Sequence, residues 1–411
     1  MNVCAVMDSA AAGAASRTPA GTGCVGAAFA GLRIGLVGPL PPPAGGMANQ
    51  TRQLAELLSA EGAQVELVQT NAPYQPAIVG RVPVLRALFR LAPYLAALWR
   101  AAGRCEVFHV MANSGWSWHL FAAPAVRLAA LRGVAVVVNY RGGEAGVFLD
   151  RASGSVARTL RRASALVVPS GFLADVFARH RIRAIVVPNI VDLQRFRPAT
   201  QRTPGAQILV ARNLEPLYDN ATALRAFGLV RQSLPEARLV IAGSGPQESD
   251  LRRLARDLGL ADAVHFTGRL DRDAMAQAYR DADVALNPSL VDNMPNSVLE
   301  ALASGVPVVS TDVGGVPYIV EHERTALLVG AGDAPRMAQA LLRVLREPAL
   351  RERLRDAGLE QARHYTWIQV APRLAGVYRD AQARGARGGP RQPPAPTADQ
   401  SGACAPTERD D

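Results

Sequence analysis

The most informative stretch of this chain is Asn287–Gly315, NPSLVDNMPNSVLEALASGVPVVSTDVGG. The apolar run Val284–Asn287 leads into it and a loop follows. Apolar residues then recur at helical spacing from Asn296, and a second apolar run ends at Thr311. Strand, loop, helix and strand in this order are typical of a parallel α/β domain, which binds ligands at the carboxyl ends of its strands. The stretch therefore predicts a binding site in its loop.

Two acidic residues of this stretch are placed to face one cleft. Glu300 lies about one turn inside the predicted helix, and Asp292 lies on the loop before it. Asn296 or Ser297 is expected to cap the helix. The start of a helix offers free N–H groups and a positive dipole end, which suit phosphate, and carboxylates accept strong hydrogen bonds from sugar hydroxyls. The pattern favours a ligand that carries both groups.

The same alternation of apolar runs and helical segments extends through the chain in two series. A proline-containing polar break at Arg197–Gly205 separates them. We predict an α/β protein with two Rossmann-like, doubly wound domains that face each other across a cleft. The expected strands are Leu32–Val37, Val65–Gln69, Glu106–Met111, Val134–Asn139, Ala165–Pro169 and Ile185–Pro188 in the first series, and Gln207–Ala211, Ala237–Ala242, Val264–Thr267, Val284–Asn287 and Val306–Thr311 in the second.

Composition narrows the classes of function. The chain of 411 residues has a net charge of +10 and contains no lysine, which excludes Schiff-base chemistry and a P-loop lysine. Residues 1–200 hold 20 arginines and 9 acidic residues, against 25 and 26 in residues 201–411, so only the first half is basic. Anionic lipid, a phosphorylated substrate and a codon bias toward arginine remain open explanations. Nucleic acid is not expected as a partner, because the basic half lacks interleaved aromatic residues and a known motif.

The cysteines and the chain ends bear on location. No pair of cysteines has metal-ligand or redox spacing, and no apolar run reaches the roughly 20 residues that span a bilayer. We expect a cytoplasmic protein with disordered tails at 1–31 and 385–411. The cysteines are Cys4, Cys24, Cys105 and Cys404.

On these residues the chain resembles the retaining glycosyltransferases of the GT-B fold that are called group 1 or family 4. The Asp292…Glu300 pair resembles their Glu-x7-Glu signature. Further matching segments are a glycine loop at Gly45 and Gly46, Val187–Phe196 (VPNIVDLQRF), Val240–Pro246 (VIAGSGP, with Gly243), Phe266–Gly268, and Tyr365–Trp367. The resemblance implies an acceptor-binding domain at 32–198, a donor domain at 199–364, and a terminal helix at 365–384 that crosses back to the first domain.

The resemblance also implies roles for individual residues. Glu300 would hold the nucleotide ribose, and Asp292 would contact the donor sugar. The diphosphate would lie among Arg212, the two glycines of the first loop, and the N–H groups of Asn296 and Ser297. Gly243 and Gly268 would lie beside the nucleotide. The resemblance implies no cofactor and no bound metal. We assign the D-x-D sequences at 271–273 and 281–283 to a helix start and to a strand entry.

Three departures from the family pattern affect this expectation. Tyr218 occupies the position of the lysine that normally joins Arg212 at the diphosphate. His109 is present at the end of its strand, as a catalytic candidate, but Met111 replaces the second histidine of a His-x-His pattern. Arg141, before two glycines, stands near the usual place of another histidine, and it suits a phosphate on the donor or on a lipid-linked acceptor.

The segment Arg81–Arg104 has an apolar face with arginines to one side. It either lies on an anionic membrane surface or covers the core of the first domain. Pro93 is expected to divide it into two shorter helices. A family tendency toward lipid-linked acceptors favours peripheral contact with the inner face of the membrane.

The expected activity is transfer of a sugar, with retention, from a nucleoside-diphosphate sugar to a cell-surface polysaccharide, such as lipopolysaccharide, or to another lipid-linked or saccharide acceptor. Two alternatives stay open. One is a catalytically inactive scaffold or binding subunit, which the missing lysine suggests. The other is a nucleotide-sugar 2-epimerase, against which the Asp292…Glu300 segment argues.

Overall fold

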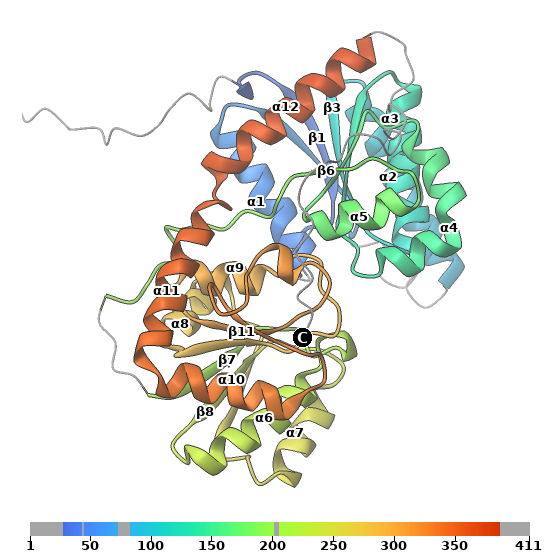
Figure 1. Ribbon diagram of the computed structural model, residues 1–411. Coiled ribbons are helices and arrows are strands. Elements are labelled where there is room, and N and C mark those ends of the chain that lie inside the picture. The colour runs from blue at the N-terminus through green and yellow to red at the C-terminus, as the bar shows by residue number, and fades with distance from the viewer. Residues whose placement is uncertain (1–27, 43–44, 73–82, 201–204, 387–411) are drawn as a thin grey trace, which may run out of the picture.

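A computed structural model describes residues 28–42, 45–72, 83–200 and 205–386, without side chains for 83–88 and 385–386. Two parallel six-stranded sheets form the two halves of the molecule (Figure 1). The predicted α/β fold with two Rossmann-like domains is therefore confirmed. Because helices cover each sheet, its central strands, such as those at Val107–Ala112, Ala135–Tyr140 and Val284–Asn287, are buried along their whole length.

The first sheet has the order β2-β1-β3-β4-β5-β6. It forms from alternating strands and helices because each strand is followed by a segment with helical spacing. Its elements are β1 (Arg33–Gly38), α1 (Gly46–Ala60), β2 (Gln64–Gln69), α2 (Pro83–Ala102), β3 (Val107–Ala112), the π-helix η3 (Trp118–Ala122), α3 (Ala123–Leu131), β4 (Ala135–Tyr140), α4 (Ala145–Leu160), β5 (Ala165–Val168), α5 (Gly171–Arg179) and β6 (Ile185–Val186).

The second sheet has the order β12-β11-β10-β7-β8-β9. Strand β12 was not predicted, since three residues are too few to show a pattern. The elements are β7 (Gln207–Val210), η4 (Pro216–Tyr218), α6 (Asn220–Ser233), β8 (Arg238–Ala242), α7 (Glu248–Asp257), β9 (Val264–Gly268), α8 (Arg272–Asp281), β10 (Val284–Asn287), α9 (Asn296–Ala303), β11 (Val308–Thr311), η5 (Val316–Tyr318), β12 (Leu327–Val329), α10 (Ala334–Arg346) and α11 (Pro348–Arg363).

The last helix, α12 (Trp367–Ala386), returns to the first domain (Figure 1). Its buried face, which includes Leu374 and Tyr378, packs in one core cluster with Ile34 and Leu36 of β1. Phe29 belongs to this cluster, with its ring stacked 5.7 Å from that of Trp367. The expectation of a disordered tail through residue 31 is therefore wrong for residues 28–31, because Phe29 is buried. Residues 1–27 and 387–411 lie outside the described residues.

Helix α2 differs from the expectation of two shorter helices. It runs through Pro93 without a break. Buried Tyr94, Leu98 and Ala101 pack against the core of the first domain, and this packing holds the helix together across the backbone hydrogen bond that a proline removes. None of the helices in the described part of the chain has the length and apolarity needed to cross a bilayer.

Candidate active site

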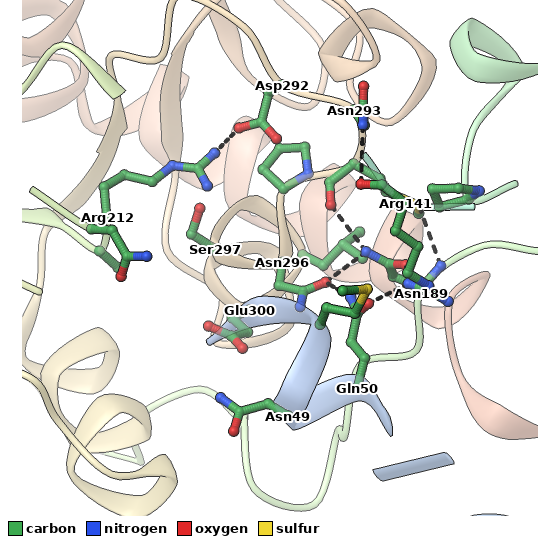
Figure 2. A pocket seen from close by; sticks show the side chains of 18 of the residues that line it. Asn49, Gln50, Arg141, Asn189, Arg212, Asp292, Asn293, Asn296, Ser297 and Glu300 are labelled. Carbon is green, nitrogen blue, oxygen red and sulfur yellow. Dashed lines mark hydrogen bonds and ion pairs between the residues drawn. The ribbon is translucent and has the colours of Figure 1, made fainter. Parts of the chain in front are cut away.

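A cleft of about 730 Å³ lies between the two domains. Its walls come from α1 and from the loops after β3 and β4 on one side, and from the loops after β7 and β10 with the start of α9 on the other. These are the carboxyl ends of parallel strands, where open α/β sheets bind ligands. Figure 2 shows the side chains that converge there.

Arg212 and Asp292 form a buried ion pair in this cleft. They follow β7 and β10, which are paired in parallel, so their loops emerge side by side. Each side chain is only 10% exposed. Arg212 Nε also donates to Asn287 Oδ1 at 2.8 Å. Burial raises the pKa of Asp292, and the guanidinium of Arg212 opposes that rise.

Tyr218 lies beside this ion pair. The guanidinium carbon of Arg212 stands 4.9 Å from the centre of the Tyr218 ring, in cation–π geometry. Burial raises the pKa of Tyr218 above its ordinary value, so the phenol is neutral at pH 7. The residue in the lysine position thus positions Arg212 and adds no charge.

Two glycines hold the loop that carries Asp292. Gly315 N donates to Asp292 O at 2.8 Å. A Cβ on Gly314 would lie 2.2 Å from Asp292 O, and a Cβ on Gly315 would lie 1.6 Å from Asn293 O. The glycine pair at the end of Asn287–Gly315 is therefore required by the close approach of two backbones.

The start of α9 opens into the cleft. Pro295 occupies the N-cap position, and no side chain caps the helix. The expectation that Asn296 or Ser297 caps it is therefore wrong: both are the first helical residues, and both line the cleft. The Ser297 hydroxyl oxygen is buried without a hydrogen-bond partner. An uncapped helix start with a free hydroxyl is suited to an anion.

Glu300 lies one turn farther along α9 and lines the same cleft. Burial raises its pKa to about 7, and the nearby Tyr279 hydroxyl and the charge of Arg272 oppose the rise. Near neutral pH this carboxyl is poised between its two protonation states. A ligand that donates hydrogen bonds to it would stabilise the ionised form.

Arg141 reaches the cleft from the first domain. Its Nε donates to Asn139 Oδ1 at 3.1 Å, and its Nη1 contacts the side-chain oxygens of Gln50 and Asn189. Both of these amides also bind Asn296 Oδ1, Gln50 at 2.9 Å and Asn189 at 2.7 Å (Figure 2). Gln50 could not be predicted from the sequence, because an amide side chain on a helix belongs to no motif.

His109 lies outside the cleft, so the expectation of a catalytic histidine is corrected. Its side chain is fully buried, with Nε2 2.9 Å from Asn139 Nδ2 and Nδ1 2.8 Å from the Tyr378 hydroxyl. Burial lowers its pKa to about 3, so the imidazole stays neutral. Because Asn139 offers its Oδ1 to Arg141, its Nδ2 donates to His109, which fixes the proton of His109 on Nδ1. His109 thus orients Asn139.

The predicted glycines divide between cleft and core. Gly46 lines the cleft, whereas Gly45 precedes it as the N-cap residue of α1. Gly243 does not line the cleft: a Cβ there would lie 2.0 Å from Arg212 O, so this glycine lets β8 support the Arg212 loop. Gly268 ends β9 with φ of +69° and also lies outside the lining. Their place beside the nucleotide stays a prediction.

The D-x-D sequences take structural positions. Asp271 caps α8 by accepting from the N–H groups of Asp273 and Ala274 at 3.0 and 2.8 Å. Asp283 accepts from Gln207 N at 2.8 Å at the entry to the second sheet. Within the described ranges, no group of three or more histidine, cysteine or acidic side chains is arranged to hold a metal ion.

Comparison with known proteins agrees with this geometry. A family model described as "Glycosyl transferases group 1" matches residues 206–347, and one described as "Glycosyltransferase Family 4" matches residues 44–195. A phosphatidyl-myo-inositol mannosyltransferase of Mycobacterium leprae is 28% identical over 384 residues, which are 87% of this chain and 99% of that protein. The chain spans about half the length of further curated relatives, which it matches at 32–34% identity.

Two solved structures share the fold. Sucrose-phosphate synthase from Thermosynechococcus elongatus superposes with a TM-score of 0.70 at 22% identity, over 86% of this chain and 99% of that one. HepE of Anabaena, solved in complex with UDP, gives a TM-score of 0.66 at 15% identity, over 85% of this chain and all of that one.

Proposed function

The chain belongs to the glycosyltransferases of group 1 and family 4, and we propose that it transfers a sugar from a nucleoside-diphosphate sugar to an acceptor hydroxyl. The observation that carries the proposal is the single interdomain cleft in which Arg212, Asp292, the open start of α9 and Glu300 converge. We infer the reaction class, sugar transfer, from membership of the family. We infer the donor class, a nucleoside-diphosphate sugar, from the convergence of these groups.

The donor would lie along the second domain. Glu300 accepts hydrogen bonds from the ribose, and the start of α9 faces the diphosphate with its N–H groups and the unpartnered Ser297 hydroxyl. Arg212 adds a positive charge beside the diphosphate. When the bond between the sugar and the diphosphate breaks, negative charge grows on the leaving oxygen, and these donors stabilise it without rearrangement.

We propose that transfer retains the configuration of the sugar. The acceptor hydroxyl attacks on the face from which the diphosphate departs, and its proton passes to the leaving phosphate oxygen. Asp292 is held by Arg212, an arrangement that suits orientation of the sugar hydroxyls better than covalent attack on the sugar. The carboxylate accepts hydrogen bonds from the sugar while it keeps its ion pair.

The acceptor would enter from the first domain, as a lipid-linked or saccharide hydroxyl. Helix α2 supports a lipid surface nearby, because Phe89, Leu95 and Trp99 are 41%, 39% and 47% exposed on it. The Arg132 guanidinium stacks 4.4 Å from the Trp99 ring centre. Helices that lie on anionic membranes typically expose aromatic and aliphatic side chains beside arginines. Flotation with phosphatidylglycerol vesicles, compared with phosphatidylcholine vesicles, tests this part: equal recovery with both would remove it.

Calorimetric titration with UDP, GDP and ADP, without added metal, tests the donor site. Saturable binding of one nucleotide to the wild type, lost in Glu300→Ala, is the expected result. The corresponding nucleotide-sugars, incubated with membrane extracts as an acceptor source, should then give a glycosylated product. Release of a free epimerised sugar would contradict transfer, and a folded protein that binds none of the three nucleotides would contradict the donor site.

A further inference from the structure

The donor side of the cleft is short of positive charge. Arg212 already faces the carboxylate of Asp292, and Tyr218 beside it is neutral. Since the chain contains no lysine, the lysine that the family pattern places beside Arg212 is absent, and the other cation that the second domain places in the cleft, Arg272, lies at the Glu300 end. A nucleoside-diphosphate sugar carries two phosphate charges, so the donor that we propose needs a further cation in this cleft.

Arg141 is a charge without a counter-ion. Its three hydrogen-bond acceptors, Asn139, Gln50 and Asn189, are all neutral amide oxygens. Within the described residues, no carboxylate forms an ion pair with it. Burial lowers its pKa to about 10, so it remains a cation at neutral pH. A partly buried cation held only by neutral dipoles is costly, and an anion arriving at the cleft would relieve that cost.

The place of Arg141 points to the anion. Gln50 and Asn189, which hold its guanidinium, both bind Asn296 at the first position of α9. A guanidinium near the positive end of a helix is unfavourable unless an anion lies between them. In Figure 2, Arg141 and Arg212 approach the start of α9 from two sides. A diphosphate at this helix start would therefore lie between two arginines.

The backbone of Arg141 also shows which end of the donor it faces. Asn293 Nδ2 donates to the carbonyl oxygens of Arg141 and Gly142 across the domain interface. Asn293 adjoins Asp292, the sugar end of the proposed donor site, whereas Glu300 marks the ribose end. Arg141 thus lies toward the phosphate that bears the sugar.

A buried chain of hydrogen bonds holds the Arg141 guanidinium in place. Tyr378 on α12 binds His109, His109 binds Asn139, and Asn139 binds the guanidinium. This buried chain fixes the guanidinium before any ligand arrives, so little ordering is left to be done on binding.

We propose that Arg141, supplied by the acceptor domain, binds the sugar-bearing β-phosphate of the donor and replaces the cation that Tyr218 lacks. The proposal rests on the proposed function, since it assumes a nucleoside-diphosphate donor. A phosphate on the acceptor is the other source of the same chemistry, and nucleotide binding separates the two, because the acceptor is absent from that measurement.

The test compares a nucleoside diphosphate with its monophosphate, using whichever of the UDP/UMP, GDP/GMP or ADP/AMP pairs the wild type binds. Arg141→Gln should lower the affinity for the diphosphate by about tenfold or more and the affinity for the monophosphate by much less, because a charge-assisted contact to one phosphate is lost. Arg158→Gln, which removes an exposed arginine on α4 outside the cleft, is the matched control and should leave the ratio of diphosphate to monophosphate affinity unchanged.

An unchanged ratio in Arg141→Gln would overturn the proposal and assign Arg141 to the acceptor. Equal losses in Arg141→Gln and Arg158→Gln would also overturn it, since they would show only a general field effect. If Arg141→Gln does not fold, Arg141→Met, with an uncharged side chain of similar length, takes its place with the same two outcomes. If the wild type binds none of the nucleotides, the proposed function itself is contradicted, and this outcome is distinguishable from either result above.

Discussion

Replacing Glu300 by glutamine should stabilise the unliganded protein and abolish nucleotide binding. Burial raises the pKa of this carboxyl from 4.5 to about 7, so the folded protein resists its ionisation. Glutamine keeps the size of the side chain, and the Tyr279 hydroxyl keeps its hydrogen bond to Ser297 O at 2.9 Å. It removes the charge, and with it the strong acceptor that the ribose would use.

The magnitude follows from the pKa difference. Below about pH 4.5 the carboxyl is protonated in both the folded and the unfolded chain. Between pH 4.5 and 7 only the unfolded chain ionises, so the folded state loses stability as the pH rises. Above pH 7 the loss is constant, at most about 3 kcal/mol for a shift of this size. Glutamine has no such loss, so the variant should be more stable than the wild type at pH 8 and closer to it at pH 5.

Thermal melts at pH 5 and pH 8 measure this difference. Between these values the melting temperature of the wild type should fall more than that of Glu300→Gln, by up to roughly 6–12 °C for a domain of this size. Titration of a nucleotide-sugar, whose diphosphate has no proton to lose in this range, should show affinity rising with pH through 7 in the wild type and no measurable binding in the variant. A variant that melts below the wild type at pH 8, or that follows the same pH dependence, would refute the argument from burial.

Three further outcomes are expected. Asp292→Asn should lower kcat by about 100-fold or more while nucleotide binding is kept or tightened, because Arg212 loses its carboxylate partner and turns to the diphosphate; a loss confined to KM would contradict the assigned role. Gly315→Ala should destabilise the protein by about 2 kcal/mol or more, because its Cβ would lie 1.6 Å from Asn293 O, and an unchanged melting temperature would contradict the close packing of these loops. Treatment with EDTA should leave turnover unchanged, and restoration of a lost activity by Mg²⁺ or Mn²⁺ would show that the site recruits a metal.

The sequence predicted the architecture well because the strands are buried on both faces. Apolar runs such as Val284–Asn287 are bounded by glycine, proline or polar residues, so their limits are visible along the chain. The helix through Pro93 and the order of residues 28–31 escaped prediction, because both depend on packing against elements distant in sequence. Phe29 is ordered by Trp367 and Tyr378, which lie at the other end of the chain.

The candidate site was predictable where local spacing determines it. Asp292 and Glu300 were found because a loop and the helix after it are continuous in sequence. The role of His109 was not predictable, because a histidine at a strand end is compatible with either a catalytic or a structural place. Its place is decided by Tyr378, 269 residues away. The amide Gln50 gave no signal, and Asn189 belonged to a matched segment without an assigned role, since the function of both comes from where the two domains meet.

The two departures on the donor side, aspartate at 292 and tyrosine at 218, meet at one residue. Arg212 pairs with the carboxylate of Asp292 and stacks on the ring of Tyr218, so neither departure acts on its own. Tyr218→Lys would place a second cation beside Arg212 and remove the ring that positions it, and Asp292→Glu would lengthen the carboxylate by one methylene. Because all three side chains are in contact, the effects of the two substitutions on nucleotide affinity should differ from additivity by about 1 kcal/mol.

A double-mutant cycle of Tyr218→Lys, Asp292→Glu and their combination measures this coupling by titration with the nucleotide that the wild type binds. We expect each single variant to weaken binding and the double variant to recover part of the loss, because the longer carboxylate and the lysine together restore the family arrangement around Arg212. Strictly additive effects would mean that the contacts among the three side chains do not govern donor binding. The replacement of lysine by Tyr218 would then be a loss that only another cation, such as Arg141, can offset.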